Sequence, residues 1–123
     1  MRCWAVAAAL LTAGLAAGCT EFGPPGSSAT VEGVQGVVLP GWPRAVERHI
    51  ARTCYPGPGP AGGALLDVGV DIFGFVRVVG PAIPQEAGPF GAQAAHVLLS
   101  SNCGHFSAPE TPVRALIRIY PSP

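Results

Sequence analysis

Apolar and polar residues alternate along residues 64–72, the stretch ALLDVGVDI. One set of alternate positions holds Leu66, Val68, Val70 and Ile72, and the other holds Leu65, Asp67, Gly69 and Asp71. Successive side chains of a strand point to opposite faces of its sheet, so this pattern predicts a strand with one buried face. Residues 75–80, rich in Val, predict a second strand, and residues 113–120 alternate again and predict a third.

Two further stretches have helical spacing. Residues 43–54 place Val46, His49, Ile50 and Thr53 on one side, and Pro43 suits the first position of a helix. Residues 90–104 place Phe90, Ala94, Val97, Leu98 and Ser101 along one side, and Gly104 suits the position just after a helix.

The element order is therefore helix, strand, strand, helix, strand, which predicts an α+β fold. The first two strands form a hairpin around Gly74. We expect a three-stranded antiparallel sheet in the order second, first, third, with both helices side by side on its apolar face. The other face is expected to carry Asp67 and Asp71, opposite arginines of the neighbouring strands. These arginines are Arg77, Arg114 and Arg118.

The N-terminus has a different character. Arg2 precedes an apolar run over residues 4–17, which is shorter than the roughly 20 residues of a membrane span. This pattern predicts a secretory signal peptide. Its end, Leu15-Ala16-Ala17-Gly18-Cys19, resembles the lipobox of bacterial lipoproteins. The resemblance implies removal of residues 1–18 and attachment of lipid, including palmitate, to Cys19. Thr20 in place of Asp implies the outer membrane, on the periplasmic side.

Residues 19–41 are rich in Gly, Pro and Ser and predict a flexible tether, which spans at most about 80 Å at roughly 3.5 Å per residue. Residues 37–39 are ambiguous, because they fit either a short strand or a segment packed on the domain. A single small domain over residues 42–123 is expected to follow.

Part of this domain carries a second resemblance. Val68, Val70, Gly74, Val76 and Val78 form a Val-rich hairpin, and Phe106 and Pro109 precede the last strand. With the helix ending in CYP, these features resemble the C-terminal domain of TonB and TolA-type envelope proteins, over residues 44–120. The resemblance implies docking of a peptide or protein partner, often as an added strand. The uncleaved inner-membrane helix and long spacer of that family have no counterpart in this sequence.

Under that resemblance, the candidate partner-binding edge is the third strand. Its candidate residues are Arg114, Leu116, Arg118 and Tyr120.

The four cysteines of the sequence have different expected fates. Cys3 leaves with the signal peptide and Cys19 takes lipid, so Cys54 and Cys103 remain. In an oxidising compartment these two are expected to form a disulfide. Two alternatives stay open at this point: a zinc site with His49 and His105, or a reactive thiol.

Composition adds little chemistry. The net charge is zero, which does not favour a nucleic-acid partner, and we expect no cofactor. No Gly-x-Ser-x-Gly stretch, phosphate loop or His-Glu-x-x-His is present. Asp67 and Asp71 share a face, but adjacent arginines argue against acid–base catalysis. We therefore expect a non-enzymatic, lipid-anchored binding module, with a structural or a metal-binding lipoprotein as the alternatives.

Overall fold

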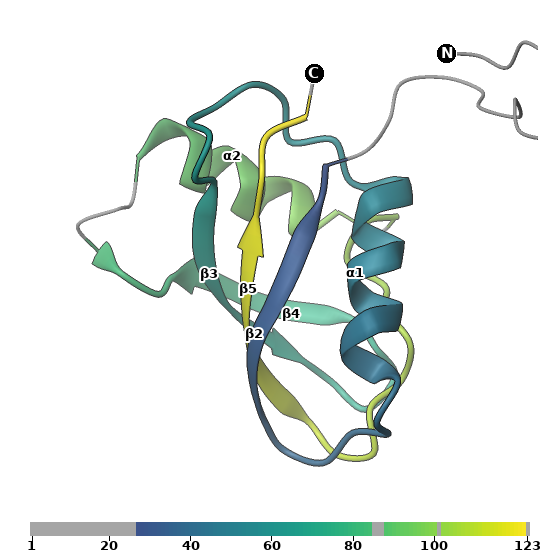
Figure 1. Ribbon diagram of the computed structural model, residues 1–123. Coiled ribbons are helices and arrows are strands. Elements are labelled where there is room, and N and C mark those ends of the chain that lie inside the picture. The colour runs from purple at the N-terminus through teal and green to yellow at the C-terminus, as the bar shows by residue number, and fades with distance from the viewer. Residues whose placement is uncertain (1–26, 85–87, 101, 123) are drawn as a thin grey trace, which may run out of the picture.

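A four-stranded antiparallel sheet with two helices on one face forms the body of the protein (Figure 1). The computed structural model describes residues 27–84, 88–100 and 102–122. The strands, in the spatial order β2-β5-β3-β4, are β2 (Ala29–Gln35), β5 (Val113–Ile119), β3 (Ala64–Val70) and β4 (Val76–Pro81). The α+β class is confirmed.

The three strands predicted from the sequence have the expected neighbours, since β3 pairs with β4 on one side and β5 on the other. The prediction of only three strands was wrong, because β2 pairs with the free side of β5. Residues 27–41 are therefore not a flexible tether. The segment 37–39 is not a strand, and its Val37 and Leu39 are exposed.

The core lies between the sheet and the helices. Alternate residues of β3 and β5 are buried there, including Val68 and Ile117, both fully inaccessible. Ile72, expected to join them, is instead 47% exposed, because β3 ends at Val70 and the chain turns.

The helices cover different parts of the sheet. Helix α1 (Trp42–Thr53) packs against β2, and α2 (Pro89–Leu98) packs against β3 and β4 (Figure 1). A proline occupies the first turn of each helix, where a missing N–H costs nothing. Helix α2 was predicted to extend to Gly104, but it ends at Leu98.

The predicted disulfide between Cys54 and Cys103 is present, with a Cα–Cα distance of 5.1 Å. Cys54 directly follows α1, whereas Cys103 lies in the turn after α2. The helices therefore need not be parallel for their ends to be joined. The two sulfur atoms are bonded to each other. In this state neither cysteine can bind zinc as a thiolate or act as a reactive thiol.

The predicted signal peptide, Cys19 and residues 19–26 of the predicted tether lie outside the described residues. Within the part of the chain that the structure describes, no helix has the length and hydrophobicity needed to cross a membrane.

Candidate functional site on the open face of the sheet

The face of the sheet opposite the helices carries three ion pairs between neighbouring strands. Arg114 of β5 pairs with Asp67 of β3, and Arg118 of β5 pairs with Glu32 of β2. Arg77 of β4 pairs with Asp71, which follows β3. We call this surface the open face. The predicted opposition of Asp67 and Asp71 to arginines is confirmed, whereas Arg118 pairs with Glu32, a residue the sequence placed in a tether.

Arg114 lies at the centre of the open face. Its Nε donates to Asp67 Oδ1 at 3.0 Å and its Nη2 donates to Asp67 Oδ2 at 2.6 Å, so the pair is bidentate. These hydrogen bonds, with the attraction of the carboxylate, raise the pKa of Arg114 above its ordinary value. The two contacts fix the plane of the guanidinium across the sheet.

Asp71 organises the adjacent hairpin. Its Oδ1 accepts the backbone N–H groups of Phe73 and Phe75, and its Oδ2 accepts Arg77 Nε at 2.7 Å. Desolvation alone would raise the pKa of Asp71, but these hydrogen bonds outweigh it and lower the pKa below 3.8. The Arg77 guanidinium also lies 5.5 Å from the centre of the Phe75 ring, whose neighbour in a stacked arrangement is His105.

Two hollows flank Arg114. One, of about 440 Å³, lies between β2, β5 and β3 and is lined by Gly33, Gln35, Asp67 and Leu116. The other, of about 320 Å³, extends toward Asp71 and Arg77. Gln35 and Arg114 line both hollows, which therefore adjoin. Gly33 contributes no side chain to the first hollow, where its half-buried backbone lies near the exposed Leu116. Val78, which is also exposed, packs over the buried Gly69 of β3.

The candidate edge strand of the sequence analysis is not an edge. Strand β5 has hydrogen-bonded neighbours on both sides, so its backbone cannot accept an added strand. The side chains of Arg114, Leu116 and Arg118 nevertheless project onto the open face, because alternate β5 residues are buried on the other side. The fourth predicted residue, Tyr120, follows the strand, and its N–H donates to Ser28.

The two actual edges are partly occupied. In β2, the N–H of Val31 donates to the Glu47 carboxylate of α1 at 2.9 Å. In β4, the N–H of Val76 donates to the carbonyl of Gly104, and Pro81 has no N–H. Such features hinder the addition of another strand.

Sequence reasoning missed the β2 residues of this site, Glu32, Gly33 and Gln35. Apolar residues alternate at Ala29 and Val31, but the register then shifts between Val31 and Gly33. This β-bulge moves Val34 to the core-facing side and breaks the period of two. The short alternation of Ala29 and Val31 before Glu32 was the only local pattern that could have indicated a strand here.

The histidines of the proposed zinc alternative have other contacts. His49 Nε2 lies 3.1 Å from the carbonyl oxygens of Asn102 and Cys103, and His105 stacks on Phe75. Among the residues described, no group of three or more His, Cys, Asp or Glu side chains is arranged to hold a metal ion.

Comparison of the chain with protein-family models, curated proteins and solved structures found no match.

Proposed function

We propose that this protein is a lipid-anchored binding module of the bacterial cell envelope that docks a periplasmic protein or peptide on its open face. The observation that carries the proposal is the pair of adjoining hollows around Arg114. They combine exposed apolar side chains with a guanidinium whose orientation is already fixed by Asp67. Apolar contact surface together with ordered arginine is common in protein interfaces.

The site suits an extended surface contact better than a buried small molecule. The hollows are open to solvent along the sheet, and their charges are already paired within the protein. A partner side chain that enters beside Leu116 buries apolar surface without leaving Arg114 or Asp67 unpaired. The anchor itself is inferred from the lipobox, and the likeness to TonB and TolA-type domains remains a prediction.

Site-specific photo-crosslinking in cells tests this docking surface. A photoreactive residue at Leu116 or Val78 should give one discrete adduct with an envelope protein. The same residue at Leu99, which is 49% exposed on the helical side, is the matched control and should give none. Arg114→Ala should reduce the yield at Leu116, because it removes the side chain that both hollows share.

Equal yields at Leu99 and Leu116 would contradict docking on the open face. No adduct at either open-face position would favour the structural alternative, a lipoprotein without a dedicated partner.

A further inference from the structure

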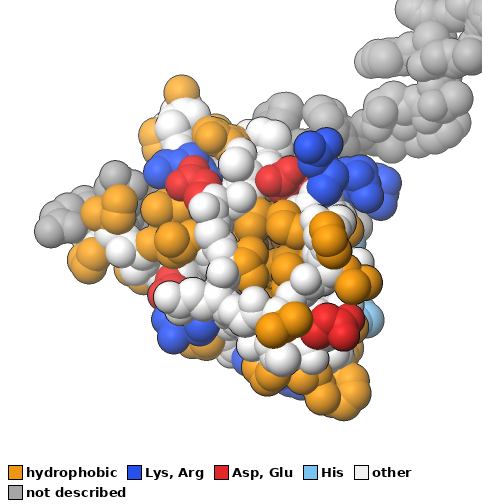
Figure 2. Space-filling view, turned by 60° about the horizontal axis from the view of Figure 1, so that its bottom comes forward, with side chains coloured by type: hydrophobic (Ala, Val, Ile, Leu, Met, Phe, Trp, Pro, Cys, Tyr) orange, Lys and Arg blue, Asp and Glu red, His pale blue; other side chains and the backbone are white. Residues whose placement is uncertain are grey.

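The basic residues of the described chain fall into two separate groups. Every basic charge comes from arginine, because the sequence contains seven arginines and no lysine. Arg77, Arg114 and Arg118 lie on the open face, each in an ion pair. The other three are Arg44, Arg48 and Arg52 of α1. Figure 2 shows basic side chains gathered on opposite sides of the molecule.

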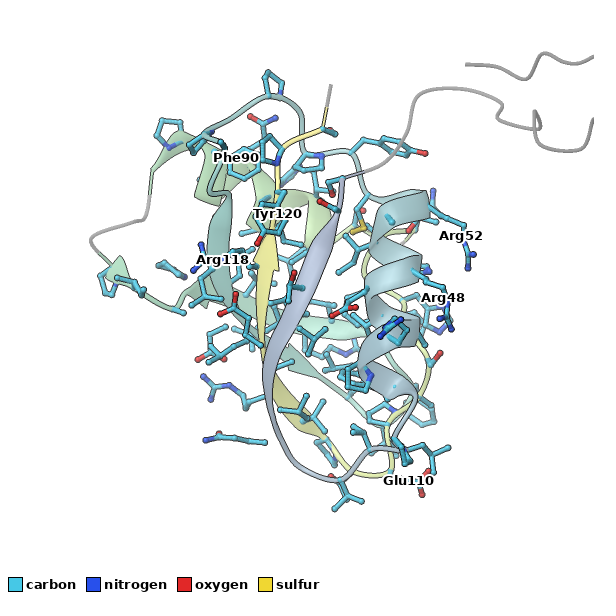
Figure 3. The ribbon with its side chains drawn as sticks, viewed as in Figure 1. Arg48, Arg52, Phe90, Glu110, Arg118 and Tyr120 are labelled. Atoms are coloured by element: carbon cyan, nitrogen blue, oxygen red, sulfur yellow. A yellow bond between two sulfur atoms is a disulfide. The ribbon has the colours of Figure 1, made fainter. Side chains whose placement is uncertain are left out.

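The three α1 arginines form one stripe along the helix. They recur every fourth residue, and each lies two residues from buried Val46 or Ile50, which is about 200° around the helix axis. The stripe therefore points away from the sheet, and Figure 3 shows Arg48 and Arg52 directed outward. Arg44 has a loose contact of 3.7 Å with Glu47, whereas Arg48 and Arg52 form no ion pair with any described residue.

The stripe lies beside the point where the chain enters the fold. Ser27 is 1% exposed, and its N–H and hydroxyl both donate to the carbonyl of Cys54, which directly follows α1. Ser27 is thus held at the end of α1, and seven residues, 20–26, lie between it and Cys19 in the sequence. The eight residue steps from Cys19 to Ser27 span at most about 28 Å at roughly 3.5 Å per residue, instead of the 80 Å that the longer predicted tether allowed.

We infer that the arginine stripe of α1 lies against the anionic phospholipid headgroups of the membrane that holds the lipid anchor. This inference rests on the proposed lipidation of Cys19, which keeps the stripe within a short tether's reach of a phosphate-rich surface. Each basic residue near such a surface raises the ratio of membrane-apposed to detached orientations about five-fold. Because α1 covers the opposite face of the sheet, this orientation turns the open face away from the membrane, toward a periplasmic partner.

Energy transfer from Trp42 to lipid headgroups measures this orientation. Trp42 is the only tryptophan after residue 18 and begins α1. The lipidated mature protein is placed in phosphatidylcholine vesicles that carry dansyl headgroups, with or without phosphatidylglycerol. Transfer should be greater with phosphatidylglycerol, and raised salt should remove the difference because it screens the charges.

In Arg48→Gln/Arg52→Gln, the ratio of membrane-apposed to detached orientations should fall about 25-fold. The matched control, Arg77→Gln/Arg114→Gln, removes the same charge from the open face and should keep the transfer of the original protein. Circular dichroism establishes that both variants remain folded.

Equal transfer in the two kinds of vesicle, or unchanged transfer in the α1 variant, would overturn the inference while leaving the anchor and the docking surface intact. Mass spectrometry of the same sample shows whether the lipid anchor itself is missing. A mature protein without acyl chains on Cys19 would remove the anchor, and with it the short tether on which this orientation depends.

Discussion

At the scale of single residues, the two faces of the sheet impose opposite requirements. Val68 is fully inaccessible in the core, whereas Arg77 on the open face has a side chain that is 66% exposed. On the open face, water and an oppositely charged side chain stabilise a charge. In the core neither is present, so a charge there destabilises the folded state.

Val68→Asp should therefore lower the free energy of unfolding by more than about 3 kcal/mol, because it buries a charge without a partner. Arg77→Ala should cause only the small loss typical of an exposed ion pair. Urea denaturation of the two variants checks this. Losses of similar size would mean that the faces have been assigned incorrectly.

Asp71 makes part of the stability dependent on pH. Its pKa is lower in the folded protein than the ordinary 3.8, so the folded state favours the carboxylate. The resulting stabilisation is present above the ordinary pKa and is lost as the pH falls through the lower, folded value. Below that value, Asp71 is protonated in both states and contributes nothing of this kind.

Asp71→Asn removes this titration while keeping an oxygen that accepts backbone N–H groups. The difference in unfolding free energy between the original protein and Asp71→Asn should be greatest above the ordinary pKa and should shrink in acid. Denaturation at several pH values between about 6 and 2 measures it. A difference that grows in acid would contradict the direction of the shift.

At the scale of elements, β2 and the disulfide both close the fold around α1. β2 covers the free side of β5, and Ser27 just before it bonds to Cys54 at the end of α1. Cys54 in turn is joined to Cys103 after α2. Removal of β2 or of the disulfide should therefore lower the free energy of unfolding of the whole domain.

Truncation distinguishes a strand from a tether. A chain that begins at Ser27 should unfold at the same urea concentration as the mature protein. A chain that begins at Gly36 lacks Ala29, Val31 and Val34, which pack on the core, and should lose more than about 2 kcal/mol. If both truncated chains were equally stable, β2 would have no structural role.

The disulfide should contribute about 4 kcal/mol, because it closes a loop over a sequence separation of 49 residues in the unfolded chain. Cys54→Ser/Cys103→Ser should show this loss in denaturant unfolding. A thiol assay on the unfolded, unreduced mature protein should detect no free cysteine. Two free thiols in protein isolated from the oxidising compartment would contradict the bond.

At the level of the whole molecule, the inferred orientation would place the proposed anchor nearest the membrane, the arginine stripe next and the open face farthest from it. Such an arrangement requires no energy source and no moving part. It needs only an anchor that keeps the domain close to the membrane and a helix that prefers an anionic surface. The proposed partner would then meet Arg114 and its hollows on the side directed away from the lipid.

Lipidation at Cys19 is the premise of that arrangement. Mass spectrometry of the mature N-terminus should find an acylated cysteine, because the lipobox is complete. Cys19→Ser should release the protein from membranes, apart from the weak electrostatic attraction of α1. A mature N-terminus at Cys19 that carries no acyl chain would exclude the lipid anchor.

Elements whose signals are local could be predicted without knowledge of the fold. The alternation in β3 and β5, the helical spacing of apolar residues, Pro43 near the start of α1 and the cysteines left to pair were sufficient to predict three strands, two helices, the neighbours of β3 and the disulfide. Strict periodicity and side-chain chemistry are properties of short segments, so they can be read without knowing what lies beside them.

Residues 29–35 form a strand because of contacts that the sequence pattern does not reveal. The bulge near Gly33 disrupts their alternation, and pairing with β5 stabilises a segment whose local pattern is weak. The fourth strand then turned β5 from an edge into an interior strand and placed Gln35 beside Arg114. It also removed residues 29–35 from the predicted tether. These outcomes depend on contacts with β5, 78 or more positions away along the chain, and a local pattern does not specify such contacts.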